Sequence, residues 1–249
     1  MAKRFKLISC NVLFREVSLI AAQSENFIDA TFLRQGLHDT PEILQKTLQA
    51  EIDRIDSGDD IYTFHARYNN WDFDAILLGY GLCSNGIVGI HSKKYPIVIP
   101  RAHDCITLFL GSKEKYADYF GKNSGTFWYN ASWIENSPTP SEQTEKEMLE
   151  VYAEKYGDEN AEFLVSTELT GNYSQCAFIR WDELPFPQYE KYTQDAAEYF
   201  GWEYDLVEGD SDLMRDFLNG NWSDERFLII PPGKTAASDA ATDDIIQAI

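Results

Sequence analysis

Hydrophobic residues along the chain form two patterns, short continuous apolar runs and longer stretches with helical spacing. Continuous runs are typical of parallel strands that are buried on both faces. They predict strands at residues 5–13, 28–33, 75–78, 96–99, 175–180, 203–206 and 227–230. Helical spacing, or an apolar run that opens a helix, predicts helices at residues 17–22, 41–55, 105–110, 112–119, 141–156, 160–169, 188–200 and 211–218. Alternation of the two patterns predicts an α/β fold, with a mainly parallel sheet and helices on both faces.

Three segments between these elements bear on the organisation of the chain. Residues 136–141 contain two prolines and three Ser or Thr residues, which is typical of a linker. We therefore expect an N-terminal α/β half at residues 1–135 and a C-terminal half at 136–249, as two similar Rossmann-like halves or as parts of one large sheet. Residues 85–90 predict a short helix, and the small, polar residues 234–249 predict a mobile tail.

Composition narrows the class of protein. The 249 residues include 41 acidic and 21 basic ones, giving a net charge of -20, which disfavours binding to nucleic acid. The chain contains no apolar run of the ~18 residues that a membrane helix needs. Its first apolar run is soon followed by charged Arg15 and Glu16, unlike a signal peptide. We expect a cytoplasmic protein that binds neither nucleic acid nor membranes, and the sequence does not set its oligomeric state.

The candidate chemistry lies after the predicted strands. Cys10, Cys83, His103 and Cys105 each stand at or just after the first, third or fourth strand. In a flavodoxin-like order these strands are neighbours, and ligands bind beyond their carboxyl ends. Thiolate and imidazole form a soft ligand set for zinc, for iron or for an iron–sulfur cluster. Two other interpretations stay open, namely ordinary buried cysteines beside a polar pocket and a reactive thiol.

Three further residues near this edge are catalytic candidates. Asp104 is a ligand candidate, or it orients His103 from behind. His38 follows the second strand and is a candidate ligand or proton shuttle, although it would equally help to cap the next helix. Arg101 is a candidate for binding an anionic group, and a structural ion pair would explain it as well.

Cofactor contacts are predicted at Gly79, Gly81 and Trp128. The two glycines belong to a Gly-rich turn after the third strand, but the turn lacks the GxGxxG pattern of a dinucleotide site. Trp128 belongs to an aromatic segment, residues 126–133, that would form a wall for a large planar ligand. Aromatic residues at this density also form protein cores.

Four motifs carry a resemblance to a known family. They are LHDTP at residues 37–41, GYGLCSNG at 79–86, IPRAHDC at 99–105 and GTFW at 125–128. Together, over residues 5–135, they resemble a family of unknown function from bacteria and methanogenic archaea, often encoded beside corrinoid-dependent methyltransferases. The resemblance implies a role in one-carbon or methylamine metabolism, a corrinoid protein or methyltransferase as partner, and a corrinoid as an indirect cofactor. It implies no established catalytic residues.

Three hypotheses follow for the function. The first is a metal-binding protein, either an enzyme or an accessory factor for corrinoid-dependent methyl transfer. The second is a metal-free thiol enzyme of the racemase type, with Cys83 and Cys176 as an acid/base pair, although Cys176 is predicted at the unsuitable end of its strand. The third is a partner-binding protein without catalysis.

Overall fold

A computed structural model describes residues 2–58, 72–171, 173–239 and 244–249. The chain divides into two compact units. Residues 1–116 and 210–249 form the first unit, and residues 117–209 form the second. The mixed α/β class with mostly parallel sheets is confirmed.

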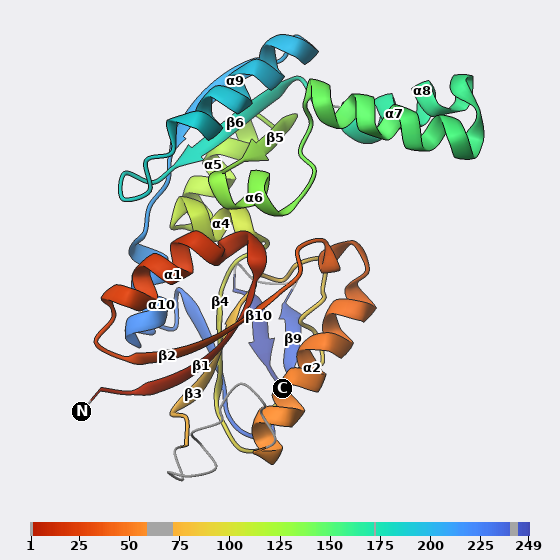
Figure 1. Ribbon diagram of the computed structural model, residues 1–249. Coiled ribbons are helices and arrows are strands. Elements are labelled where there is room, and N and C mark those ends of the chain that lie inside the picture. Colours follow the sequence, from red (N-terminus) through yellow and green to blue (C-terminus); the bar gives the residue numbers. More distant parts are fainter. Residues whose placement is uncertain (1, 59–71, 172, 240–243) are drawn as a thin grey trace. The chain divides into compact units, whose positions relative to one another are not determined.

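The first unit is built on a five-stranded sheet (Figure 1). Its order is β2–β1–β3–β4–β8, so the strands expected to be neighbours, β1, β3 and β4, are adjacent. The first four strands pair in parallel, and β8 pairs antiparallel with β4. The bounds are β1 Arg4–Cys10, β2 Phe27–Leu33, β3 Ala75–Gly79, β4 Ile97–Pro100 and β8 Phe227–Ile230.

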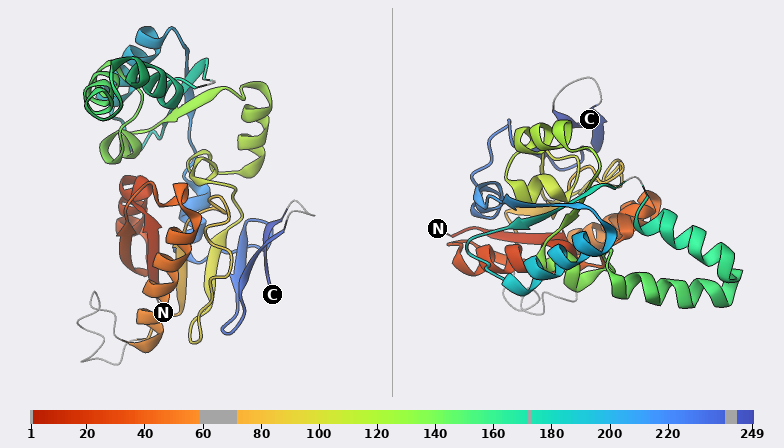
Figure 2. Two further views of the ribbon diagram at one scale, coloured as in Figure 1. Left: turned by 90° about the vertical axis from the view of Figure 1, so that its right-hand side faces the viewer. Right: turned by 90° about the horizontal axis from the view of Figure 1, so that it is seen from above.

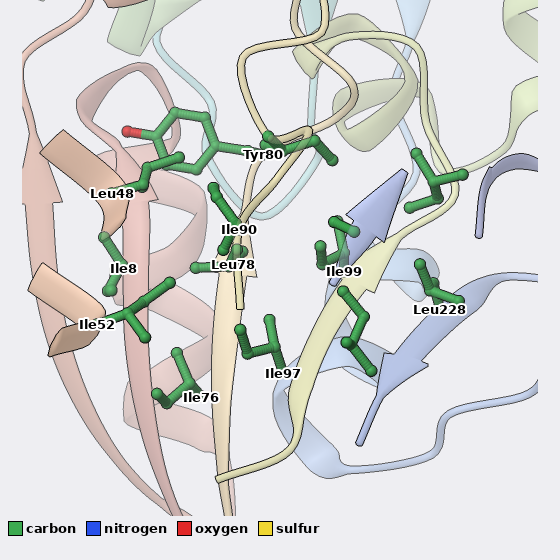
Figure 3. Close-up of a cluster of buried hydrophobic side chains, with 14 of the residues drawn as sticks. Ile8, Leu48, Ile52, Ile76, Leu78, Tyr80, Ile90, Ile97, Ile99 and Leu228 are labelled. Carbon is green, nitrogen blue, oxygen red and sulfur yellow. The ribbon is translucent and has the colours of Figure 1, made fainter. Parts of the chain in front are cut away.

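Helices cover both faces of this sheet (Figure 1). On one face α2 packs its buried Leu48 and Ile52 against Ile8, Ile76 and other residues of the strands (Figure 3). Helices α1 and α10 lie on the opposite face. The bounds are η1 Asn11–Leu13, α1 Phe14–Gln23, η2 Leu37–Asp39, α2 Pro41–Ser57, α4 Cys105–Leu110 and α10 Asp212–Asn219. Helix α5, Lys113–Lys122, begins in the first unit and continues into the second.

The second unit has a three-stranded parallel sheet in the order β5–β6–β7. Its core gathers Tyr129 and Phe178 from the strands with Ala196 and Ala197 from α9. The remaining bounds are β5 Thr126–Tyr129, α6 Ala131–Asn136, α7 Glu142–Tyr156, α8 Asp158–Leu169, β6 Gln175–Arg180, α9 Pro187–Phe200 and β7 Glu203–Glu208. None of the described helices has the length and apolarity needed to cross a membrane.

The boundary between the units differs from the expected one at residue 135. The expected linker lies inside the second unit, where Thr139 is 1% exposed and the Pro140 carbonyl accepts a hydrogen bond from the Tyr129 hydroxyl at 2.8 Å. The chain returns to the first unit after residue 209, because β8 completes the sheet beside β4. Residues 136–141, with their two prolines, are therefore part of the second unit and do not divide the chain.

The expected mobile tail is wrong. Residues 236–239 and 245–248 form an antiparallel hairpin, β9 Ala236–Asp239 and β10 Ile245–Ala248. This C-terminal hairpin lies beside β8 and places Ala236, Ile245 and Ile246 in the core (Figure 2). The expected helix at residues 85–90 is also absent, since that segment is a series of turns.

The packing of the hairpin predicts that truncation of two isoleucines near the end of the chain will affect stability differently. Ile246 is fully buried, whereas Ile249 is 62% exposed. We expect Ile246→Ala to lower the free energy of unfolding by about 2–5 kcal/mol, as for other buried aliphatic truncations. Ile249→Ala should change it by less than about 0.5 kcal/mol. Urea unfolding followed by tryptophan fluorescence measures both, and equal effects would contradict the packing of the hairpin.

Candidate functional site

Three cysteines stand at one edge of the first unit's sheet. Cys10 is the last residue of β1, Cys83 lies four residues beyond the end of β3, and Cys105 is the first residue of α4 after β4. Because β1, β3 and β4 are parallel neighbours, their carboxyl ends share this edge. The sheet order thus brings together residues that are far apart in the sequence.

The loop after β3 is tied to the loop after β4 by two backbone hydrogen bonds. Leu82 N–H donates to the Ala102 carbonyl at 2.7 Å, and Cys83 N–H donates to the His103 carbonyl at 3.0 Å. These bonds continue the pairing of the strands beyond their ends. They hold the backbone of Cys83 beside the segment that leads into Cys105.

The segment that carries Cys83 has an unusual backbone. Cys83, Ser84 and Asn85 have φ values of 47°, 55° and 68°, all in the left-handed region that disfavours residues with a Cβ atom. Gly86 N–H closes the turn by donating to the Cys83 carbonyl at 3.0 Å. Such conformations cluster at functional sites, where the surrounding structure holds them in place.

Gly79 and Gly81 allow the close approach of neighbouring backbone segments. A Cβ atom on Gly79 would lie 2.4 Å from Ser9 Oγ. One on Gly81 would lie 2.8 Å from both the Ala102 carbonyl oxygen and the Asp104 nitrogen. These glycines therefore shape the edge itself, and their contact with a cofactor stays a prediction.

Electrostatic effects link the three thiols. Burial raises the pKa of the Cys83 thiol to about 12, and the charges of Cys10 and Asp104 act in the same direction. Burial also raises the pKa of Cys105, with further contributions from Asp104, Cys83 and Cys10. The pKa of Cys10 is raised mainly by burial as well. The thiols therefore share one environment, where they are protonated and weakly nucleophilic at neutral pH.

Asp104 has a defined structural role. Its Oδ1 accepts hydrogen bonds from the backbone of Ile106 at 3.0 Å and of Thr107 at 3.4 Å, which caps the start of α4. Its Oδ2 accepts a hydrogen bond from the Tyr116 hydroxyl at 3.0 Å. Among the described residues no hydrogen bond joins Asp104 to the His103 ring, so the expected orienting contact is not seen.

The other sequence candidates at this edge have exposed side chains or structural contacts of their own. The His103 side chain is exposed, and its role as a ligand stays a prediction. His38 is also exposed, with its Nε2 3.3 Å from Asp39 Oδ1 in η2. Arg101 donates to the backbone carbonyls of Asp224, Asp244 and Ile246 at 2.7, 2.9 and 2.5 Å. Arg101 therefore fastens the C-terminal hairpin, which favours the structural interpretation over anion binding.

Trp128 and Cys176 belong to the core of the second unit. Trp128 is 8% exposed and lies beside Tyr119, with ring centroids 4.7 Å apart. Cys176 is fully buried in β6, and its thiol donates to the Thr193 carbonyl at 3.8 Å. Burial raises the pKa of Cys176 to about 12. Both residues thus pack inside this unit, and a contact of Trp128 with a cofactor stays a prediction.

One residue at the edge was missed by the sequence analysis. Tyr80 directly follows β3, and it is only 4% exposed. Burial and the charges of Cys10 and Cys83 raise the pKa of its hydroxyl, which places the phenol in the same environment as the thiols. The position of this tyrosine between the two glycines of the GYG sequence could have marked it as a residue of the site. A single aromatic residue after a strand is, however, common in protein cores.

The side chains as they stand do not form a ligand cage. Among the described residues, no three His, Cys, Asp or Glu side chains take up an arrangement that would hold a metal ion. The thiols lie close enough to influence one another's pKa, while ligation would require their sulfur atoms to converge further.

Comparison with known proteins gives one match. The model of a family described as "Protein of unknown function (DUF1638)" matches residues 32–218, which is most of the chain and includes Cys83 and Cys105. No curated protein matches the chain. No solved structure matches it either.

The contact at Gly81 predicts a matched pair of glycine substitutions. Gly81→Ala should push the loops after β3 and β4 apart and lower the free energy of unfolding by about 1–3 kcal/mol, as overpacking does. It should also speed modification of the native thiols by an aromatic disulfide reagent at pH 8. Gly121→Ala is the control, because its Cβ meets nothing within 4 Å in α5, and it should stabilise the chain by about 0.5–1 kcal/mol. Unchanged stability and thiol reactivity in Gly81→Ala would contradict the close approach.

Proposed function

The chain belongs to the DUF1638 family of proteins of unknown function, and we propose that this member binds a metal ion or cluster through Cys10, Cys83 and Cys105. The observation that supports the proposal is that three cysteines from three separate segments stand at the carboxyl edge of one sheet. If the three cysteines were ordinary core residues, they would stand at the same end of three adjacent strands only by chance.

The electrostatics of the site favour a cation. Cys83 and Cys105 are costly to ionise, because burial and the negative charge of Asp104 disfavour their thiolates. A divalent ion or an iron–sulfur cluster would replace the protons and compensate the negative charge. Soft thiolate ligands suit zinc and iron–sulfur clusters better than magnesium or calcium. We therefore propose zinc or iron, the latter as a single ion or an iron–sulfur cluster.

We propose that these residues ligate a metal through rotation of their side chains. The position of a cysteine sulfur depends on a single side-chain torsion with three staggered states. The backbone of Cys83 is held by its hydrogen bond to His103, and that of Cys105 begins a helix capped by Asp104. The proposal requires that rotation of the side chains on these supports brings the sulfur atoms within reach of one ion. The fourth position would fall to the exposed His103 imidazole or to an exogenous ligand.

The sequence motifs resemble a family that is often encoded beside corrinoid-dependent methyltransferases, and this resemblance suggests a use for such a metal centre. We propose a role beside methyl transfer in one-carbon metabolism, as an enzyme or an accessory factor, where zinc would activate a thiol or water and iron would serve redox chemistry. Gel filtration of the metal-loaded chain with hydroxocobalamin gives a direct test. Co-elution of the corrin absorbance with the protein supports a corrinoid as ligand, and complete separation counts against direct binding.

A metal-free racemase reaction is disfavoured by the surroundings of Cys176. An acid/base pair needs thiols that reach a substrate, whereas Cys176 is fully buried and its thiol donates to a backbone carbonyl. Its high pKa also makes it a poor base at neutral pH. The non-catalytic alternative, a partner-binding protein, differs from our proposal in needing no metal at the three thiols.

Metal analysis of protein purified without oxygen tests the proposal. We expect about one zinc ion, or one iron centre with its sulfide, per chain. Cys83→Ala and Cys105→Ala should each reduce the bound metal at least tenfold, because a three-thiolate set loses a principal ligand. Cys176→Ala is the matched control and should keep the full content. A wild-type chain without stoichiometric metal, also after incubation with Zn²⁺ or Fe²⁺ and sulfide, would overturn the proposal.

A further inference from the structure

One end of the first unit's sheet is an open strand edge. In the order β2–β1–β3–β4–β8, strand β2 pairs with β1 on one side and with no described strand on the other. At the opposite end of the sheet the C-terminal hairpin lies beside β8 (Figure 2). An edge strand presents unpaired N–H and C=O groups, which form a template for pairing with another chain. The outer edge of β2 is therefore a candidate interaction surface.

Three residues of β2 turn these backbone groups outward. The Phe27 N–H donates to the Lys3 carbonyl at 2.9 Å, so the backbone groups of Phe27 face β1. In a parallel pair such as β1 and β2, successive residues alternate between facing the partner strand and facing away from it. The outward-facing groups are therefore those of Ile28, Ala30 and Phe32. Among the described residues, none forms a hydrogen bond with them.

Strand β2 lacks the features that usually keep edge strands from pairing. Such strands are commonly very short, or carry a proline or an exposed lysine. β2 has seven residues, with the sequence FIDATFL, and contains neither. Its one charged residue, Asp29, lies 3.0 Å from Lys6 Nζ of the neighbouring strand, and its side chain is only 15% exposed. No charge on the strand thus opposes the approach of a further strand.

The sequence of β2 fits an antiparallel copy of itself, related by a two-fold axis at Ala30. In this register Ile28 stands opposite Phe32 of the second copy, and Phe27 opposite Leu33. Both pairs join apolar side chains, and an aromatic residue opposite a β-branched one is a favourable cross-strand pair. Each pair of outward-facing residues exchanges two hydrogen bonds. The small side chain of Ala30 meets its own copy at the axis.

The charges at the ends of β2 are complementary in the same register. Arg34, just after the strand, is exposed, and it would stand next to the exposed Glu25 of the second copy. Because the axis is two-fold, this contact of opposite charges occurs twice. Asp29 would stand opposite the neutral Thr31, so no like charges meet along the strand.

Exposed aromatic rings flank the edge on both faces of the sheet. Phe14 of α1 is 46% exposed, and its ring centroid lies 5.1 Å from that of Phe32. Phe27 is 50% exposed, with the Arg4 guanidinium 4.3 Å from its ring centroid. Phe27 and Phe32 point to opposite faces, because side chains alternate along a strand. Pairing at β2 would thus cover apolar surface on both sides of the joined strands.

We propose that β2 is the interface of a symmetric dimer, in which two copies of the chain join their five-stranded sheets through antiparallel β2 strands. The occupant of the edge is a second copy, because this register gives every apolar residue of β2 an apolar partner and brings opposite charges together at both ends. The inference does not depend on the proposed metal centre.

Sedimentation velocity of the full chain over a range of concentrations tests the dimer. We expect the wild-type chain to sediment with twice the monomer mass. Ala30→Pro removes an outward-facing N–H and leaves the hydrogen bonds to β1 intact, so its circular dichroism and urea midpoint should stay close to those of the wild type. Its dimer should be at least about 100-fold weaker, since two hydrogen bonds at the axis are lost.

A charge exchange tests the register with substitutions at exposed positions. Arg34→Glu should weaken the dimer about 3–10-fold, because like charges then meet at both ends. Adding Glu25→Arg to it should restore the wild-type affinity. Lys234→Glu is the matched control, because this exposed lysine lies just before the C-terminal hairpin at the opposite end of the sheet, and its dimer should be unchanged.

Three results would overturn the proposal. They are a wild-type chain that is monomeric at every concentration, a dimer that Ala30→Pro leaves intact, and a double variant no tighter than Arg34→Glu alone.

Discussion

The candidate site depends on the pairing of two loops beyond the ends of their strands. The hydrogen bonds from Leu82 to Ala102 and from Cys83 to His103 extend the β3–β4 pairing past the sheet. They hold three successive left-handed residues in place and require a glycine at position 81, where a Cβ would strike the opposite backbone. Without this pairing, Cys83 would lie on an unconstrained turn and the three thiols would not share one environment.

Much of the fold followed from apolar patterning, because buried parallel strands leave the clearest signal in a sequence. The predicted strands at 75–78, 175–180 and 227–230 were confirmed, as was the helix at 105–110. The C-terminal hairpin escaped detection because only three of its described side chains are buried, and Arg101 fixes its backbone from a distant loop. The expected linker at residues 136–141 lies inside the second unit for a related reason. Its Thr139 and Ser141 are polar, but the second unit buries both.

The sequence indicated which cysteines would stand at one edge of the sheet, but not which hydrogen bonds the residues beside them would make. Placing cysteines after adjacent parallel strands required only strand order, and that order was confirmed. Asp104 was a candidate for the chemistry, which stays a prediction, and the structure shows that it caps α4 and accepts a hydrogen bond from Tyr116. Tyr80 was passed over because a pattern cannot show whether a buried hydroxyl has a partner. Hydrogen-bond satisfaction is a property of three-dimensional packing.

The most direct test of this account is X-ray absorption at the zinc edge of the metal-loaded chain. We predict three sulfur ligands at about 2.3 Å, the usual zinc–thiolate distance, with one lighter atom or exogenous ligand completing the set. A first shell made only of oxygen and nitrogen atoms, or one with a single sulfur, would contradict the convergence of Cys10, Cys83 and Cys105 on one ion.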